Sequence, residues 1–353
     1  MKILNKLKYY LKLSVLRQKQ GHTNVPIQLF EMLGLFLMKG IGPGYYHSAQ
    51  LWHKDKTWKY KLGWISEKKY RKRVYQYNPR PYQKISQNKL PEKALLTLFK
   101  MPTAECFGYF HPLHGRDFQG RPFCCGADVL RLLSSGRIER FCIKELEGWG
   151  GRGFQAFEVI KEEGEAMLRP MQGGQAVLVE DYFNGMSCPQ EGLVFEDYIE
   201  QHHAMSSLNP TSLNTIRVFV VWPYEDDHPQ VVGAFVRIGR VGSLVDNTTT
   251  GGLAAPVEID TGRIGCAHFK PPHSDVFASH PDHGAQIEGV TLPYWDDVKK
   301  ILIMTMPLFP YIHFGGFDVA ISTGGPMIVE LNVEPDKSGA MQINKSIEEL
   351  IPK

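Results

Sequence analysis

The sequence contains 353 residues, of which 43% are hydrophobic, 22% charged and 11% aromatic. This composition can form a sizeable hydrophobic core, which excludes a disordered or fibrous protein, and the length suggests roughly two compact lobes. The longest apolar stretches, residues 28–38 and 301–310, are well short of the ~20 residues that span a bilayer, so no transmembrane helix is expected.

Charge divides the chain into two chemically different regions. Residues 1–90 contain 19 Lys and Arg against 3 Asp and Glu, whereas the rest of the chain contains 21 against 34. A basic region is often only a solvated surface, but it can also attract anionic lipid headgroups or a polyanionic substrate. Nucleic acid is not expected as a partner, because no base-reading module or zinc-ligand spacing accompanies the charge.

The N-terminus and the cysteines predict the compartment. Residues 1–20 interleave lysines with apolar residues, so they lack the uninterrupted apolar run of ~7–15 residues of a secretory signal. The six cysteines form no C-x-x-C pair, and Cys124 and Cys125 are adjacent. Reduced thiols fit this pattern best. We therefore expect a cytoplasmic protein, which residues 1–80 could bring into peripheral contact with an anionic inner membrane surface.

The pattern of apolar residues and turns predicts helices first and mainly strands afterwards. Residues 1–82 read as helices and loops with a basic surface, and residues 94–99 as a short helix that ends before Pro102. Strands are predicted at 140–144, 176–180, 193–198, 216–222, 230–238, 317–321 and 327–331, and a helix at 294–308. Because strands dominate with helices in between, the expected fold class is α+β rather than a doubly wound parallel sheet.

The sharpest group of polar residues lies near the C-terminus. Asp318 is part of the strand-like GFDVAI, while Glu330 and Asn332 are two residues apart in IVELNVEP. Alternate side chains of a strand share one face, so Glu330 and Asn332 point the same way. If the two strands are neighbours, three oxygen-bearing side chains converge, and such hard ligands suit Mg²⁺. The alternative is a surface turn capped by Asn332.

A glycine-rich stretch follows the strand predicted at 140–144. Lys144 ends that strand, and the next residues are ELEGWGGRGF, with Gly148, Gly150, Gly151 and Gly153. Glycines let a loop fold closely over phosphates with its N–H groups free to donate, and a preceding lysine can pair with phosphate charge. The spacing matches neither a Walker loop nor the dinucleotide fingerprint, so the loop alone is weak evidence.

Two further groups suit the binding of a nucleotide and of an anion. The strand at 193–198 contains Glu196 and runs into a linker. Such a segment can read an adenine edge with backbone groups, while an acidic or amide side chain takes the amino group or ribose. The histidines at 202 and 203 form a poor zinc site. Arg217 and Arg237 lie on predicted strands and could clamp a carboxylate or a phosphoryl group. Arg240 is the arginine most easily explained as a surface ion pair.

The order of these motifs resembles the ATP-grasp superfamily, and more narrowly the sugar-transfer-associated ATP-grasp group, which is related to α-L-glutamate ligases. The resemblance covers roughly residues 88–344. Its most specific stretches are SLNTIRV from Ser212, VRIGRVGSLVDN from Val236, Gly251-Gly252, HPDHGAQIEGVTLPYW from His280, and FDVAI with VELNVEP. The resemblance implies an ATP-grasp fold, in which two α+β lobes clasp ATP.

The domains implied are a basic, mainly helical region at 1–82, a nucleotide-binding lobe at 83–200 and a C-terminal lobe with the metal site at 201–353. The resemblance also implies roles for individual residues. The phosphates of ATP are expected to bind Lys144 and Lys89, and Lys93 is an alternative to Lys89. Gly148, Gly150, Gly151 and Gly153 are expected to form a lid over the phosphates. Adenine is expected near Glu196 and Ile199, and ribose near Gln201 or His202. Asp318, Glu330 and Asn332 are expected to hold Mg²⁺ or Mn²⁺. The transferring group is expected near Arg217 and Arg237.

The function implied is that of an ATP-dependent carboxylate–amine ligase, which activates a carboxylate as an acyl-phosphate and joins it to an amine. The group name suggests a sugar, glycan or amino-acid building block of a surface polysaccharide as substrate. Two alternatives stay open. One is a phosphotransferase or kinase on the same fold, and the other is a non-catalytic protein that binds membrane or polyanion through the basic region.

Overall fold

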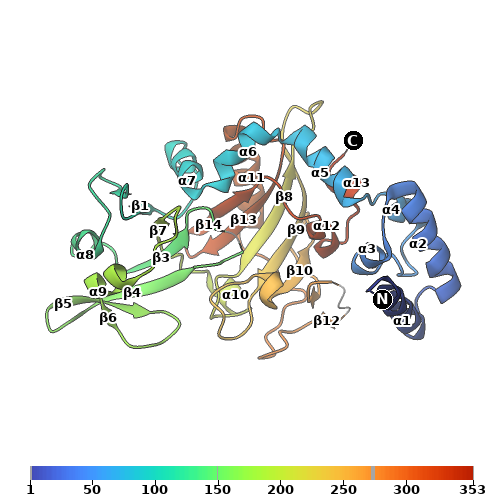
Figure 1. Cartoon of the computed structure of the whole chain (residues 1–353), viewed down its shortest axis with the longest axis horizontal. Helices are drawn as coiled ribbons and strands as arrows, with labels where there is room; N and C mark the ends of the chain where they lie inside the picture. The colour runs from blue at the N-terminus through green and yellow to red at the C-terminus, as the bar shows by residue number, and fades with distance from the viewer. Residues whose placement is uncertain (1, 149, 272–274, 353) are drawn as a thin grey trace.

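The computed structural model describes residues 2–148, 150–271 and 275–352. The chain begins with a series of helices, continues with a first seven-stranded sheet and ends with a second one (Figure 1). Every pairing between the strands of the described residues is antiparallel. The α+β class expected from the sequence is therefore confirmed.

The N-terminal region is helical, as predicted. Its helices are α1 (Lys2–Lys19), α2 (Val25–Lys39), α3 (Pro43–Ser48), α4 (Trp58–Leu62), α5 (Glu67–Tyr77), α6 (Arg80–Gln87) and α7 (Lys89–Leu98). Polar side chains begin several of them: Asn24, Ser66 and Asn88 accept backbone N–H bonds at the starts of α2, α5 and α7. The short helix predicted at 94–99 is the second half of α7.

The first sheet has the strand order β2-β1-β7-β3-β4-β5-β6. The strands are β1 (Cys106–Phe110), β2 (Arg116–Asp117), β3 (Arg140–Glu145), β4 (Gln155–Glu162), β5 (Glu165–Pro170), β6 (Val177–Leu178) and β7 (Leu193–Asp197). Helices α8 (Gly126–Leu133) and α9 (Val179–Gly185) pack on it, and an aromatic cluster that includes Phe141, Phe157 and Phe195 forms the core.

One predicted strand is wrong. The strand expected at 176–180 is only the two-residue β6, and helix α9 begins at Val179. Val179 and Phe183 are four residues apart and both buried, so they lie on one face of a helix against the core of the first sheet. A short run of apolar residues does not distinguish a buried strand from the start of such a helix.

The second sheet has the strand order β12-β11-β10-β9-β8-β13-β14. The strands are β8 (Thr215–Val221), β9 (Gln230–Ile238), β10 (Leu253–Val257), β11 (Ala267–His268), β12 (Val276–Phe277), β13 (Phe314–Ser322) and β14 (Gly325–Asn332). Around it lie α10 (His203–Ser206), α11 (Trp295–Thr305), α12 (Ser338–Gln342), α13 (Ile347–Leu350) and two 3-10 turns, Thr248–Thr250 and Met306–Leu308. The predicted helix at 294–308 is thus α11 plus the second turn.

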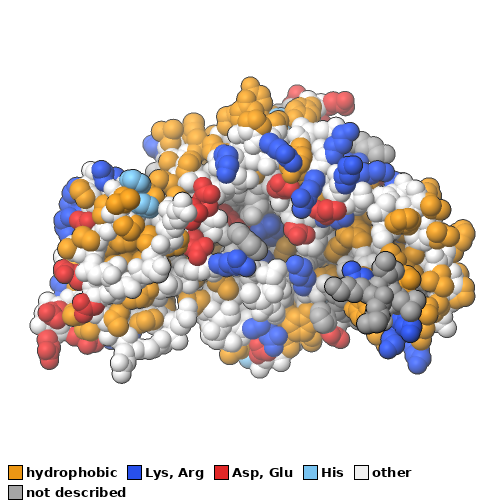
Figure 2. Space-filling view, viewed as in Figure 1, with side chains coloured by type: hydrophobic (Ala, Val, Ile, Leu, Met, Phe, Trp, Pro, Cys, Tyr) orange, Lys and Arg blue, Asp and Glu red, His pale blue; other side chains and the backbone are white. Residues whose placement is uncertain are grey.

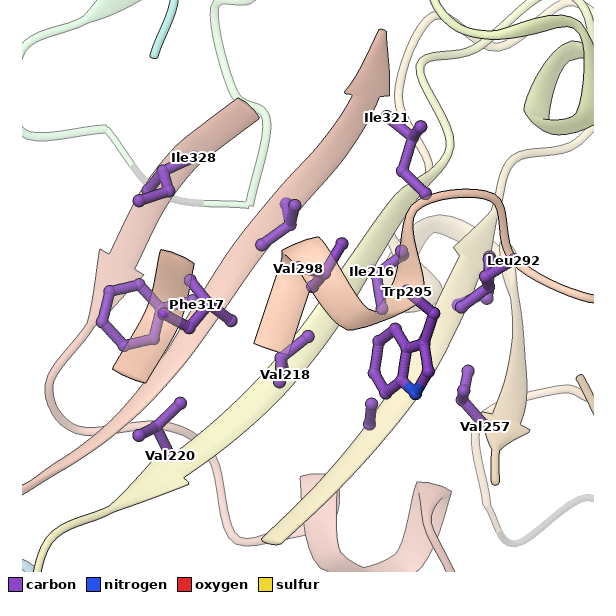
Figure 3. Packing of buried hydrophobic residues seen from close by; sticks show 14 of the residues in the cluster. Ile216, Val218, Val220, Val257, Leu292, Trp295, Val298, Phe317, Ile321 and Ile328 are labelled. Atoms are coloured by element: carbon purple, nitrogen blue, oxygen red, sulfur yellow. The ribbon is translucent and has the colours of Figure 1, made fainter. Parts of the chain in front are cut away.

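Both faces of the second sheet are covered. On one face, Trp295 and Val298 of α11 pack on Val218, Val220 and other apolar residues of the strands (Figure 3). On the opposite face, residues of the N-terminal helices, such as Tyr46, join Phe219 and Phe314 in a separate core. The basic N-terminal region is therefore packed onto the second sheet.

The domain boundaries stay a prediction. The boundary expected at 82 and 83 falls within α6, and the one at 200 and 201 falls between β7 and α10. In Figure 1 the first sheet and the helices α1 to α4 lie at opposite ends of the molecule, with the second sheet between them. The two sheets meet where β3 and β7 approach β13 and β14, whose residues line one shared cavity (Figure 1). The candidate site lies at this junction.

Candidate functional site

Asp318 and Glu330 lie opposite each other on paired strands. β13 and β14 place Asp318 directly across from Glu330, and their register shifts between Asp318 and Val319. Asn332 donates hydrogen bonds from its amide nitrogen to Oε1 of Glu330 at 3.2 Å and to the Gly316 carbonyl at 3.4 Å. The structure thus brings together the three oxygen-bearing side chains predicted to converge.

Two arginines hold the Asp318 carboxylate. Arg217 is the β8 residue opposite Asp318. Its Nε donates to Oδ1 of Asp318, and its Nη2 donates to Oδ2 at 3.0 Å. Arg237 on β9 adds Nη2 at 2.8 Å from Oδ2. Burial alone would raise the pKa of Asp318, but Arg217 and Arg237 lower that pKa to about 2. Asp318 is therefore the permanently ionised carboxylate of the site.

Glu330 is in the opposite electrostatic situation. Burial raises its pKa, and the adjacent Asp318 carboxylate raises it further, because two nearby carboxylates resist being ionised together. A protonated Glu330 can donate a hydrogen bond to Asp318. A cation at this position would remove the conflict between the two carboxylates.

Arg237 is held in turn by a second buried carboxylate, Asp246, for which the sequence predicted no role of its own. Arg237 Nε and Nη2 donate to the Thr215 hydroxyl at 2.9 and 2.7 Å. The Thr215 backbone N–H and hydroxyl donate to Asp246 Oδ2 at 2.8 and 2.5 Å. Asp246 lies 3.5 Å from Arg237 Nε and fixes the orientation of this arginine. The only sequence signal was its place in the VDN stretch.

Lys144 and Lys93 share one buried carboxylate. Glu196 of β7 is fully buried, and its Oε2 lies 2.6 Å from Lys144 Nζ and 3.5 Å from Lys93 Nζ. Burial disfavours the charged form of Glu196, but the two lysines lower its pKa below the ordinary value. The second oxygen, Oε1, is buried without a partner. The structure therefore places Glu196 beside the lysines with one acceptor unused.

Lys89 lies beside the glycine-rich loop. Its Nζ donates to the Gly148 carbonyl at 2.6 Å, and its backbone N–H donates to the Leu146 carbonyl at 3.2 Å. Burial lowers the pKa of Lys89, while Glu330 is the strongest charge that raises it. Lys93 is bound elsewhere, since its Nζ also donates to the Thr103 hydroxyl at 2.6 Å. Lys89 is thus the lysine of α7 that touches the loop.

The glycine-rich loop of the first sheet touches the second. Gly150, Gly151 and Gly153 have φ values of 69°, 77° and 64°, which favour glycine. Asn247 of the second lobe donates from its amide nitrogen to the Gly150 carbonyl at 2.7 Å. A Cβ on Gly151 would lie 2.9 Å from Val245. The described glycines of the loop therefore contact the second lobe at Asn247 and Val245. Trp149 lies outside the described residues.

The residues predicted near adenine and ribose are separated by the structure. Ile199 packs with Ala104 and Ala320 beside a cavity of about 360 Å³ that residues 197–200 help to line. Gln201 instead donates to the Asn209 and Ser212 carbonyls. His202 accepts the Ala204 N–H at the start of α10. The polar groups of Gln201 and His202 thus form hydrogen bonds within their own loop, whereas Ile199 borders the cavity.

Glu92 is a further buried carboxylate that was not predicted. Its Oε1 accepts the Leu331 N–H at 2.8 Å, and its Oε2 is buried without a partner. Burial, and then Glu330, raise the pKa of Glu92 well above its ordinary value. The sequence signal was an acidic residue between Lys89 and Lys93 on one short helix.

Arg240, expected to form a surface ion pair, pairs with Asp282 at 2.7 Å on the exposed side.

The donor set has the chemistry of a site for a hard cation. Among the described residues, no three His, Cys, Asp or Glu side chains form a metal-binding group. Glu330 and the Asn332 carbonyl oxygen remain as two donors, since Asn332 uses its nitrogen for hydrogen bonds. Asp318 is a third donor that is shared with the arginines. Two carboxylates and an amide oxygen suit Mg²⁺ with phosphate oxygens completing its shell.

The site forms a charged hollow between the sheets. Figure 2 shows Lys, Arg, Asp and Glu side chains gathered around a depression at the centre of this face of the molecule. The lysines come from α7 and β3, the arginines from β8 and β9, and the acidic side chains from α7, β7, β13 and β14. The hollow can receive a polyanion and a cation together.

The sequence matches the model of one known protein family. A family model described as sugar-transfer-associated ATP-grasp matches residues 68–351. No protein with a curated description matches the chain.

Solved structures give only distant similarity. N5-carboxyaminoimidazole synthase from Aspergillus clavatus, in complex with ADP and 5-aminoimidazole ribonucleotide, is 9% identical with a TM-score of 0.43, and the match covers 78% of this chain and 53% of that one. Biotin carboxylase from Campylobacter jejuni is 11% identical with a TM-score of 0.42, over 76% and 47%. D-alanyl-alanine synthetase A from Vibrio cholerae is 12% identical with a TM-score of 0.38, over 75% and 59%. The chain thus spans about half the length of these proteins.

Proposed function

The chain belongs to the sugar-transfer-associated ATP-grasp family, and from this premise we propose that it is an ATP-dependent carboxylate–amine ligase. The observation that carries the proposal is that two partly buried lysines, Lys89 and Lys144, both lie within the electrostatic influence of Glu330, which is paired with Asp318. Phosphoryl transfer needs positioned cations around the phosphates and hard ligands for a metal ion, and this site offers both.

ATP would bind with its phosphates between the lysines and the glycine-rich loop. Lys144 and Lys89 would pair with phosphate oxygens, and the N–H groups of Gly148, Gly150, Gly151 and Gly153 would cover them. Adenine would lie near Ile199, in the direction of the cavity lined by residues 197–200. The unpartnered Oε1 of Glu196 supports this placement, because a buried acceptor favours a ligand donor such as an amino group. Ribose would lie near Gln201 or His202.

Asp318, Glu330 and Asn332 would hold Mg²⁺, for which Mn²⁺ can substitute. When bound, the metal ion supplies positive charge that neutralises the phosphates. The chain's own contribution is to keep Asp318 ionised through Arg217 and Arg237. These two arginines also orient N–H donors toward the transferring group.

The proposed reaction has two steps. First, the γ-phosphoryl group passes to an oxygen of the substrate carboxylate, which releases ADP and forms an acyl-phosphate. The amine then attacks the acyl carbon, so that an amide bond forms while inorganic phosphate and a proton leave. Catalysis rests on positioning and on charge cancellation, and it needs no nucleophilic side chain.

The proposed substrates are small-molecule or glycan carboxylates and amines, in particular a sugar, glycan or amino-acid building block of a surface polysaccharide. The support for this class is the family description alone. A cytoplasmic enzyme in peripheral contact with an anionic membrane through residues 1–80 suits a lipid-linked acceptor, and the basic charge of that region supports such a location.

The test is ADP release by the full chain with Mg-ATP and pooled carboxylates, with and without pooled amines. The proposal predicts amide product and rapid ADP release only when both substrate classes are present. A phosphorylated product that accumulates and persists without amine would support a kinase instead. Absence of nucleotide binding would favour a non-catalytic binding protein.

A further inference from the structure

Helix α2 carries an apolar face that nothing in the described structure covers. Phe30 is 74% exposed, Leu33 58% and Leu37 73%, although all three are large and hydrophobic. Their spacing of three and four residues places them on one side of the helix. The exposed Leu29 and Phe36 widen this side into a continuous apolar surface, which we call the α2 outer face.

The α2 outer face is a fixed feature and not the result of a loosely placed helix. Met32 and Leu35 of the opposite side are buried in the core that the N-terminal helices share with the second sheet. Asn24 caps the start of α2, and Gly40 ends it in a left-handed conformation. Gln28 donates to the Ser14 carbonyl at 3.1 Å and so ties α2 to α1.

The surroundings of this face are strongly basic. Residues 1–54 contain eight Lys and Arg but one acidic residue, Glu31. Glu31 is turned inward, where it pairs with Lys61 Nζ at 2.5 Å and accepts the Tyr46 hydroxyl. Lys8, Lys12 and Lys19 of α1 are exposed. Figure 2 shows apolar side chains gathered over α2 with basic side chains below them over α1.

From this combination we infer that α1 and α2 form an interfacial membrane anchor. The α2 outer face lies among the acyl chains just below the headgroups of an anionic bilayer, and the lysines of α1 contact the headgroups. An apolar helix face bordered by lysines is the pattern of a helix that lies in the membrane interface. None of the described helices is long and apolar enough to cross a membrane.

Charge decides between lipid and a second copy of the chain. Two copies that joined through this face would bring their lysine-rich α1 surfaces together, and the acids Glu31 and Glu348 beside α2 already pair with Lys61 and Lys39 of the same copy. Anionic lipid supplies the missing negative charge, at ~1 kcal/mol for each basic residue near the surface. The inference deepens the proposed location and is independent of the proposed chemistry.

The test is flotation of the full chain with vesicles of phosphatidylcholine, with and without about 30% phosphatidylglycerol. We expect the wild type to float with the anionic vesicles. Phe30→Ser combined with Leu37→Ser should weaken binding about tenfold or more, because two large apolar side chains no longer enter the bilayer. Leu113→Ser, which alters a side chain 76% exposed elsewhere, should leave binding unchanged.

Two further pairs of variants test the contribution of the α1 lysines and the contribution of the apolar area of the α2 outer face. Lys8→Glu with Lys12→Glu should weaken binding to the anionic vesicles, whereas the same charge change at the exposed Lys161 and Lys300 should not. The swap Phe30→Leu with Leu37→Phe keeps the apolar area and should keep binding. Equal melting temperatures of all variants would show that they fold.

Several outcomes would overturn the inference. These are no flotation of the wild type, unchanged flotation of the Phe30→Ser and Leu37→Ser variant, or loss of flotation in the swap variant. Self-association in solution that the serine variant abolishes would instead identify a contact between copies. Glu330→Gln must float as the wild type does, so that a failure of the proposed ligase chemistry is distinguished from a failure of the anchor.

Discussion

Asp318 and Glu330 are directly paired across β13 and β14, yet the pKa values of their two carboxylates are shifted in opposite directions. Arg217 and Arg237 keep the pKa of Asp318 at about 2, whereas burial and then the Asp318 charge raise the pKa of Glu330. Asp318 is thus ionised before any ligand arrives, whereas a cation beside Glu330 would lower the raised pKa of Glu330. This difference leads to testable expectations for stability and for nucleotide binding.

The Asp318 carboxylate should make stability depend on acid pH. Its folded-state pKa of about 2 is below the ordinary 3.8, so its contribution is present above pH 3.8 and is lost as the pH falls toward 2. The full contribution is about 2 kcal/mol, of which roughly half is lost by about pH 3. Asp318→Asn should therefore cost less unfolding free energy at about pH 3 than at about pH 6.

Urea unfolding of both proteins across this pH range checks the expectation, with Asp296→Asn as control because the Asp296 side chain is 92% exposed. The control should show no such trend. A stability difference between wild type and Asp318→Asn that stays constant with pH would contradict the assigned ion pairs.

The two lysines of α7 should separate into different roles. Lys89→Met should weaken Mg-ATP binding about tenfold, since Lys89 faces the loop and one charged contact to phosphate would be lost. Lys93→Met should mainly lower stability, by about 1–3 kcal/mol, because it frees Thr103 and weakens the pair with buried Glu196. Calorimetric titration and urea unfolding measure the two effects.

Lys84→Met changes an exposed lysine of the preceding helix and should alter neither quantity. If Lys93→Met weakened nucleotide binding at unchanged stability, while Lys89→Met did not, Lys93 would be the nucleotide lysine.

Much of the fold follows from local pattern. Strands such as β8, β9 and β14 carry regular apolar runs between turns, and the sequence predicted them. The strand expected at 176–180 is wrong because a short apolar run does not distinguish a buried strand from the start of a helix such as α9, which begins at Val179. The basic N-terminal helices were predicted, but the exposed apolar side of α2 was not, since sequence alone does not show which side packs inward.

The site was only partly predictable for a different reason. Glu330 and Asn332 share a strand, so their common direction follows from the two-residue period. The pairing of Asp318 with Arg217 joins residues 101 positions apart, and such contacts depend on how distant strands are ordered in a sheet. Glu92 and Asp246 were missed because a single buried carboxylate leaves no spacing pattern in the sequence.

The glycine-rich loop should tolerate a side chain poorly at one position. A Cβ at Gly151 would meet Val245 at 2.9 Å, so Gly151→Ala should hinder the closed loop and reduce kcat/KM for ADP release, by about tenfold if the clash costs about 1.4 kcal/mol. Gly164→Ala is the matched control, because its φ of 88° is equally unfavourable while nothing lies within 4 Å of its Cβ. Equal rates for the two variants would show that contact with Val245 does not matter.

Thermal unfolding with nucleotide tests most directly whether Glu330 is part of a Mg-ATP site. Ligand at ~100 times its Kd should stabilise the wild type by ~2.7 kcal/mol. We predict this shift for Mg-ATP in the wild type and in the exposed-site control Glu165→Gln, a much smaller shift without magnesium, and none in Glu330→Gln. A missing shift in the wild type at millimolar Mg-ATP, or a full shift in Glu330→Gln, would contradict the account.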